Sequence, residues 1–174
     1  MSKKKLKIIG TIIAFLLCFP LHFLYDKFPN FITSVFGPVN ESIWEHMKIL
    51  FGGILLSGVI QKIIAIVKKE NYNNICFSNF VAGIVSIPIF LVLFLPVYYV
   101  IGENMPVTIF IMFIAIVIAE VVSYLIMKKH DLGLEKITIF FVIIMYIIFT
   151  FLSYFPPRTE IFLDPKEEIY GINK

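Results

Sequence analysis

The residues best suited to chemistry lie around the start of the second long apolar segment. Glu41 and Glu45 are four residues apart, as are Ser42 and His46, so on a helix each pair shares a face. Carboxylates and imidazoles gathered in one place can hold a divalent metal or transfer protons. The candidate ligand-binding or structural polar residues are His22, Asp26, Asn40, Glu41, Ser42, Glu45, His46 and Asp164, and the candidate metal ligands are His22, Asp26, Glu45 and His46.

Helix capping offers a structural explanation for most of the same residues. Asn40 or Ser42 can accept a hydrogen bond from the first turn of the following helix, and Ser42 with Glu45 fits a capping box. Acidic side chains at Glu41 and Glu45 also suit the positive end of the helix dipole. Between residues 37 and 48, capping, the helix dipole and an interfacial position for Trp44 account for each residue type except His46, so the sequence leaves both a polar site and a structural role open.

A second candidate is an ionisable residue inside an apolar segment. Glu120 lies about two turns from the end of the fourth apolar segment, and an ionisable group at that depth is a functional hypothesis by default. The alternative is a carboxyl group that faces a neighbouring helix and is hydrogen-bonded by Ser123 or Tyr124. Glu103 adds one further carboxylate in the loop that precedes this segment.

Membrane helices must position these residues. Of the 174 residues, 59% are hydrophobic, and the mean hydropathy is +0.92, so a soluble core could not bury this much apolar surface. The apolar runs do not alternate with polar residues as barrel strands would, and backbone groups in lipid must be paired internally. We therefore predict an all-α integral membrane bundle of about five transmembrane helices, over residues 8–25, 43–67, 80–101, 107–127 and 137–155.

One face of the second predicted helix carries small and polar residues. His46, Gly53, Ser57 and Gln61 fall on a single stripe. Small residues let membrane helices approach closely, so we expect this stripe to face protein rather than lipid. That orientation would turn His46 toward the interior of the bundle.

The basic residues predict an orientation, because Lys and Arg are enriched in cytoplasmic loops. With the N-terminus in the cytoplasm, ten of the 15 Lys and Arg residues lie on the cytoplasmic side. The transmembrane domain then covers residues 1–155, and residues 156–174 form a tail outside the cell. Because the tail contains Ile161, Phe162 and Tyr170, we expect it to fold back over the helix ends as a cap.

Two motifs carry a resemblance to a known family. One is Pro38–Lys48, with the sequence PVNESIWEHMK, and the other is the tail pattern of two prolines, FLDP and YG between residues 156 and 171. Together they resemble a family of small bacterial polytopic membrane proteins that is classified as a domain of unknown function. The resemblance covers most of the chain and implies that the two motifs belong together, but it implies no activity.

Three functions are compatible with the sequence. We prefer a non-enzymatic binding or accessory protein of the cell membrane, whose polar cluster at the outer face holds the tail. The second is a metal-dependent intramembrane hydrolase that acts on a lipid or envelope substrate and uses a divalent metal. The third is a small proton-coupled transporter component that uses Glu120. The expected partners are the lipid bilayer and either a second copy or a membrane partner protein, whereas the net charge of +3 argues against nucleic acid.

Overall fold

The computed structural model describes residues 1–102 and 104–172, and within them the chain is all-α, with a single isolated bridge and no strand. Five of the described helices are long and apolar enough to cross a membrane, so the predicted fold class is confirmed. The orientation of the termini stays a prediction. The elements are α1 (Lys3–His22), α2 (Leu24–Lys27), α3 (Phe31–Phe36), α4 (Ile43–Val67), α5 (Ile75–Ile101), α6 (Met105–Met127), α7 (Glu135–Tyr154) and the 3-10 turn η1 (Glu160–Phe162).

Two of the long helices, α1 and α5, begin five residues before their predicted segments. Ser2 Oγ accepts the backbone N–H of Lys5 at 3.2 Å, and this cap draws the basic residues at the N-terminus into the first turns of α1. Before α5, the Asn74 side chain donates to the carbonyl of His130 at 2.8 Å and accepts the N–H of Leu132 at 2.9 Å. These bonds tie the start of α5 to the loop between α6 and α7.

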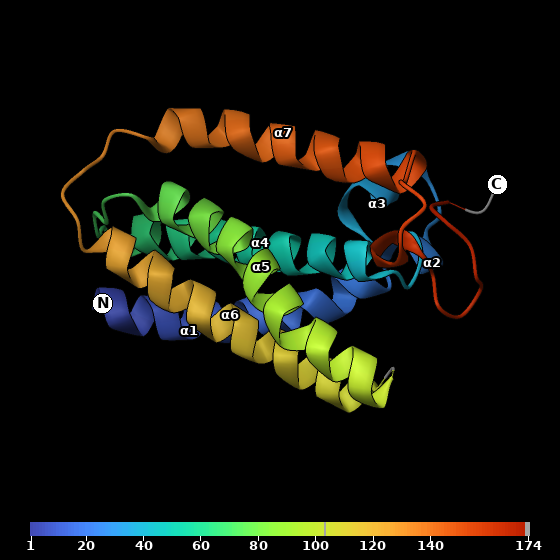
Figure 1. The fold of residues 1–174 in the computed structure, drawn as a ribbon. Helices are drawn as coiled ribbons and strands as arrows, with labels where there is room; N and C mark the ends of the chain where they lie inside the picture. The colour runs from blue at the N-terminus through green and yellow to red at the C-terminus, as the bar shows by residue number, and fades with distance from the viewer. Residues whose placement is uncertain (103, 173–174) are drawn as a thin grey trace.

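Helices α1 and α4 run antiparallel and pack closely against one another (Figure 1). Ser57 Oγ donates a hydrogen bond to the carbonyl of Gly10 at 2.7 Å. A Cβ atom on Gly53 would lie only 2.9 Å from the carbonyl oxygen of Ala14, which is backbone and cannot turn aside. The small residues therefore bring the two backbones into direct contact, as in many membrane helix pairs.

Helix α4 lies between α1 and α7 (Figure 1). Aromatic rings pack on its α7 side. The ring of Phe51 lies 5.6 Å from that of Tyr146 and 5.5 Å from that of Phe149, and the Trp44 ring lies 5.1 Å from Phe149. Because it is covered on both sides, α4 is the most buried of the five long helices.

The outward faces of the long helices are apolar. On α1, Ile8, Ile12 and Leu16 recur every four residues and are all at least half exposed. On α7, Ile139 and Phe151 are exposed to a similar degree. Such broad apolar faces are compatible with a lipid bilayer as the surrounding medium.

One end of the bundle carries α2, α3 and the residues after Tyr154, and we call it the α3 end (Figure 1). There the ring of Phe162 lies 4.9 Å from that of Trp44 in the first turn of α4. The Asn40 side chain donates to the carbonyl of Gly171 at 2.9 Å. The chain after α7 thus returns to the loop that leads into α4.

Candidate metal centre

Two histidines meet at the α3 end because α1 and α4 stay packed side by side as far as their last and first turns there. One turn before the end of α1, Cys18 Sγ lies 3.9 Å from the carbonyl oxygen of Ile49. One turn further toward the α3 end, the rings of His22 and His46 meet edge to face with centroids 5.5 Å apart. The small residues deeper in the bundle therefore set the distance between these two side chains.

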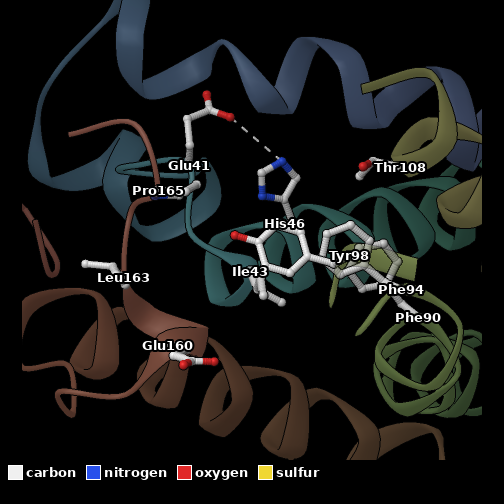
Figure 2. A pocket seen from close by; sticks show the side chains of 10 residues that line it. All are labelled: Glu41, Ile43, His46, Phe90, Phe94, Tyr98, Thr108, Glu160, Leu163 and Pro165. Carbon is white, nitrogen blue, oxygen red and sulfur yellow. Dashed lines mark ion pairs between the residues drawn. The ribbon is translucent and has the colours of Figure 1, made fainter. Parts of the chain in front are cut away.

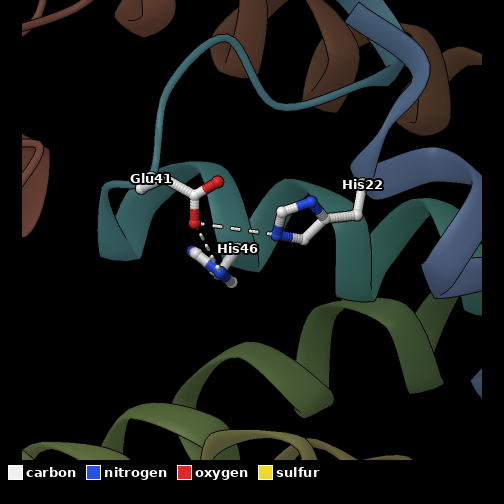
Figure 3. A group of neighbouring side chains, drawn as sticks. All are labelled: His22, Glu41 and His46. Atoms are coloured by element: carbon white, nitrogen blue, oxygen red, sulfur yellow. Dashed lines mark ion pairs between the residues drawn. The ribbon is translucent and has the colours of Figure 1, made fainter. Parts of the chain in front are cut away.

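The Glu41 carboxylate lies beside both histidines. Its Oε2 is 3.7 Å from His22 Nε2 and 3.9 Å from His46 Nε2, and both rings point toward it (Figure 3). One ligand atom from each residue can be chosen so that all three lie within 4.8 Å of one another. Two imidazoles and one carboxylate form a donor set that suits zinc and related divalent transition metals.

The hydrogen bond made by His46 determines which ring nitrogen faces Glu41 as an acceptor. Its Nδ1 lies 2.9 Å from the carbonyl oxygen of Ser42, and because a carbonyl can only accept, Nδ1 carries the proton. In the neutral ring, Nε2 then directs a lone pair toward the Glu41 carboxylate. The His46 Nε2 lone pair and the Glu41 carboxylate are both acceptors, so a cation between them would stabilise this arrangement. Histidines that bind metals commonly place their other nitrogen on a backbone carbonyl in the same way.

The tail positions Glu41 from the other side. Asp164, which is buried, accepts the backbone N–H of Glu41 through Oδ2 at 2.9 Å. Its Oδ1 accepts the backbone N–H of Lys166 at 2.8 Å, and the Lys166 ammonium lies 3.5 Å from Glu41 Oε2. The structure thus brings Asp164 next to the cluster as an acceptor for backbone groups, with both of its oxygens already engaged.

A cavity of about 430 Å³ adjoins the cluster between α1, α4 and α6, and His22, Glu41 and His46 all form part of its wall. A second hollow of about 40 Å³ shares Glu41 and His46 and is lined by the rings of Phe90, Phe94 and Tyr98 (Figure 2). The apolar residues around the larger cavity are Phe19, Phe23, Ile49, Met105, Ile109 and Met112.

Glu45, a candidate metal ligand, lies away from the histidines and against α7. Its Oε2 is 2.6 Å from the Lys48 ammonium, and both side chains are fully buried. Lys48 also donates to the carbonyl of Ser34 at 2.9 Å and to Ser153 Oγ at 3.1 Å, while Ser153 donates to Glu45 Oε1. Sequence reasoning missed Lys48 and Ser153, although a lysine three residues after Glu45 on a helix is a signal for such a pair.

The remaining candidate residues do not join the cluster: Ser42 and Asn40 make capping contacts, and Asp26 makes no side-chain contact with it. Ser42 caps α4 by accepting the N–H of Glu45, as the capping pattern predicts. The second bond of the capping box is replaced, because Ser42 donates its own N–H to Asn40 Oδ1 at 3.0 Å. Asp26 is exposed, and its side chain makes no hydrogen bond or ion pair with the described part of the chain. Glu103 lies outside the described residues.

Glu120 is paired with Lys7, one of the ten basic residues predicted to lie on the cytoplasmic side. Lys7 Nζ lies 3.1 Å from Glu120 Oε2 and donates to Asn79 Oδ1 at 2.9 Å. Gln61 donates to Glu120 Oε1 at 3.5 Å, and all of these side chains are buried. Lys7 carried no signal of its own because it ends a run of basic residues of the kind that flanks many membrane helices.

The two hydroxyl groups expected to bond Glu120 have other surroundings. Ser123 Oγ is buried without a hydrogen-bond partner among the described residues. Tyr124 lies under the Lys128 ammonium, which is 5.6 Å from the centre of its ring. The ion pair with Lys7, and not a bond from its own helix, is therefore the main contact of Glu120.

Over the described residues, the fold and the cluster define an all-α protein with five helices suited to a membrane and a histidine–carboxylate cluster at one end of the bundle. The chain matches the model of a Family of unknown function (DUF6512) over residues 1–172, and it belongs to that family. The family resemblance seen in the sequence is thereby confirmed. No curated protein and no solved structure matches the chain.

Proposed function

We propose that this protein is a multi-pass protein of the cell membrane that binds one divalent transition-metal ion, with zinc as the first expectation. The ligands are His22 Nε2, Glu41 Oε2 and His46 Nε2. One observation carries the proposal: the Nδ1 of His46 is bonded to a carbonyl, so its Nε2 lone pair and the Glu41 carboxylate face the same point. A cation at that point would satisfy both acceptors.

The distances between the Glu41 carboxylate and each histidine suit a metal with little rearrangement. Zinc bonds to histidine nitrogen and carboxylate oxygen are about 2.0–2.2 Å, so neighbouring ligands of a tetrahedral site are roughly 3.4 Å apart. The two histidine–carboxylate distances, 3.7 and 3.9 Å, exceed that value by only a few tenths of an ångström. Three protein ligands leave a fourth position open, and the large cavity lies beside it.

A binding role fits the cluster better than hydrolysis does. A zinc hydrolase commonly uses a carboxylate beside the metal-bound water as its base. Among the described residues near the cluster, Glu45 is held by Lys48 and Ser153, and Asp164 accepts backbone N–H groups. A hydrolase acting on a lipid would use the same three ligands and the open fourth position, and turnover of an ester substrate by the zinc-loaded protein would establish it.

The proposed site lies outside the cytoplasm. The distribution of Lys and Arg supports this orientation. The tail contributes Asp164 and Lys166 to the surroundings of Glu41, so we propose that residues after Tyr154 cap the site. A metal site that is covered by the tail also fits the binding or accessory role that we prefer from the sequence, in which the polar cluster holds the tail.

A zinc titration tests the proposal. Competition with a chromophoric chelator gives the zinc affinity of detergent-solubilised protein that carries no histidine tag. Changing a group that only supports a zinc ligand costs about 10–100-fold in affinity, so His46→Ala, which removes a ligand, should cost at least about 100-fold. The matched control is His130→Ala, because His130 lies in an exposed loop. Equal affinities for the two variants, or no zinc binding by the unmodified protein, would contradict the proposal.

A further inference from the structure

The large cavity beside the metal centre has apolar walls that reach the lipid-facing surface. Phe19 of α1 and Phe23, which directly follows α1, line it on one side and Met105 of α6 on the other. These residues are 38%, 50% and 65% exposed, and the outward faces of α1 and α6 beside them are apolar. A molecule in the surrounding bilayer therefore has direct access to this cavity.

The two ends of the cavity differ in chemistry. At the α3 end the wall carries His22, Glu41, His46 and the ammonium of Lys166. Deeper in the bundle, the wall consists of Ile49, Met112 and their apolar neighbours. A volume of about 430 Å³ lies in the range of small-molecule sites. The shape and polarity suit an amphiphile whose polar group lies at the α3 end.

We propose that the cavity binds one phospholipid with an anionic headgroup, drawn from the bilayer leaflet at the α3 end. This inference rests on the proposed metal site. A phosphate oxygen occupies the fourth coordination position, and the Lys166 ammonium lies near the same phosphate. One acyl chain extends between α1 and α6 toward Met112.

Charge complementarity favours an anionic lipid over a neutral one. A divalent metal and Lys166 bring three positive charges to the polar end, and Glu41 supplies one negative charge among the residues that line it. The metal and Lys166 lie on the same carboxylate oxygen in this arrangement, so both are placed to contact one phosphate. A zwitterionic headgroup would add a positive group to an end that is already positive.

Two separate cavities are lined by α1 and α6, and tryptophan substitutions on α6 in each of them provide a matched test. Ile109→Trp places a large ring in the proposed lipid cavity, and Met105→Trp does so at its exposed mouth. Val121→Trp is the control, because it lies on the same helix and lines a separate cavity of about 370 Å³ between α1 and α6. Zinc affinity and melting temperature without added lipid show whether each variant is folded.

The probe is phosphatidylglycerol, with phosphatidylcholine for comparison, and the readout is retained lipid by native mass spectrometry with and without zinc. We expect the zinc-loaded protein and Val121→Trp to retain phosphatidylglycerol, and the two cavity variants to retain at least about tenfold less at unchanged zinc affinity. Equal retention by all variants, by both lipids or without zinc would overturn the lipid proposal. Absence of zinc binding would instead overturn the metal site.

Discussion

Replacing Glu120 with leucine should lower the free energy of unfolding by about 3–5 kcal/mol, because it leaves a buried ammonium without its counter-charge. Lys7 is 4% exposed, and its remaining described partner would be the amide oxygen of Asn79. The apolar surroundings of α1 and α6 make an unpaired charge costly. The measurement is the unfolding transition of the detergent-solubilised protein.

The double variant Lys7→Met/Glu120→Leu separates a buried ion pair from a functional carboxylate. Replacing both members of a buried pair with apolar residues is often neutral or stabilising, so the double variant should regain most of the stability lost in the single variant. If the single variant were as stable as the unmodified protein, the ion pair would not hold α1 against α6. If the double variant were stable but inactive in a transport assay, the proton-coupled transporter hypothesis would regain support.

Glu45→Gln should cause a loss of similar size, about 3–5 kcal/mol, and should leave zinc binding unchanged. The substitution removes the charge that Lys48 faces at 2.6 Å in a fully buried position. The same carboxylate accepts hydrogen bonds from Ser153 of α7 and from the N–H of Val39. These contacts join α4, α7 and the loop before α4, and none of them involves a proposed zinc ligand. The substitution should therefore lower the unfolding temperature without changing the zinc affinity.

Glu41→Gln is the matched control for Glu45→Gln, since the two carboxylates stand only four residues apart. Glu41 is partly exposed and its basic neighbours, His22, His46 and Lys166, are 3.5–3.9 Å away, so metal-free stability should change by less than about 1 kcal/mol. Zinc affinity should fall at least about 100-fold, because the substitution removes a ligand. If Glu45→Gln lost zinc and kept its stability, Glu45 would be the zinc ligand, and the structural role that we assign to it would be wrong.

The fold could be predicted because its main determinant is local. Long apolar runs without alternation leave helices as the only way to pair the backbone in lipid, and this holds whatever the helices pack against. The bounds of α1 could not be read from hydropathy. The Ser2 cap and the burial of Lys7 extend the helix through residues that look like a polar flank.

The cluster could be predicted only in part, because its geometry depends on which helices pair and in which register. The sequence indicated that the face of α4 with Gly53 and Ser57 meets protein, and it singled out both histidines and Glu41. It did not identify α1 as the partner. The recurrence of Gly10, Ala14 and Cys18 every four residues was the available signal, since these small residues precede His22 on the same face.

The two buried ion pairs were missed for a different reason. The charge distribution places Lys7 and Lys48 at the flanks of membrane helices, and hydropathy patterns give no means of telling a flanking lysine from a buried one. In the structure, each lysine is paired with a carboxylate that had been considered for chemistry, Lys7 with Glu120 and Lys48 with Glu45. The pairing thus changes the role that we assign to both acidic residues.

The central claim is that His22, Glu41 and His46 hold a metal, and elemental analysis tests it most directly. The protein is purified without a histidine tag or chelator, next to the double variant His22→Ala/His46→Ala. We predict about one equivalent of zinc or another divalent transition metal per chain in the unmodified protein, and less than about a tenth of that in the double variant. Equal metal content in both, or none in the unmodified protein after dialysis against zinc, would contradict the account.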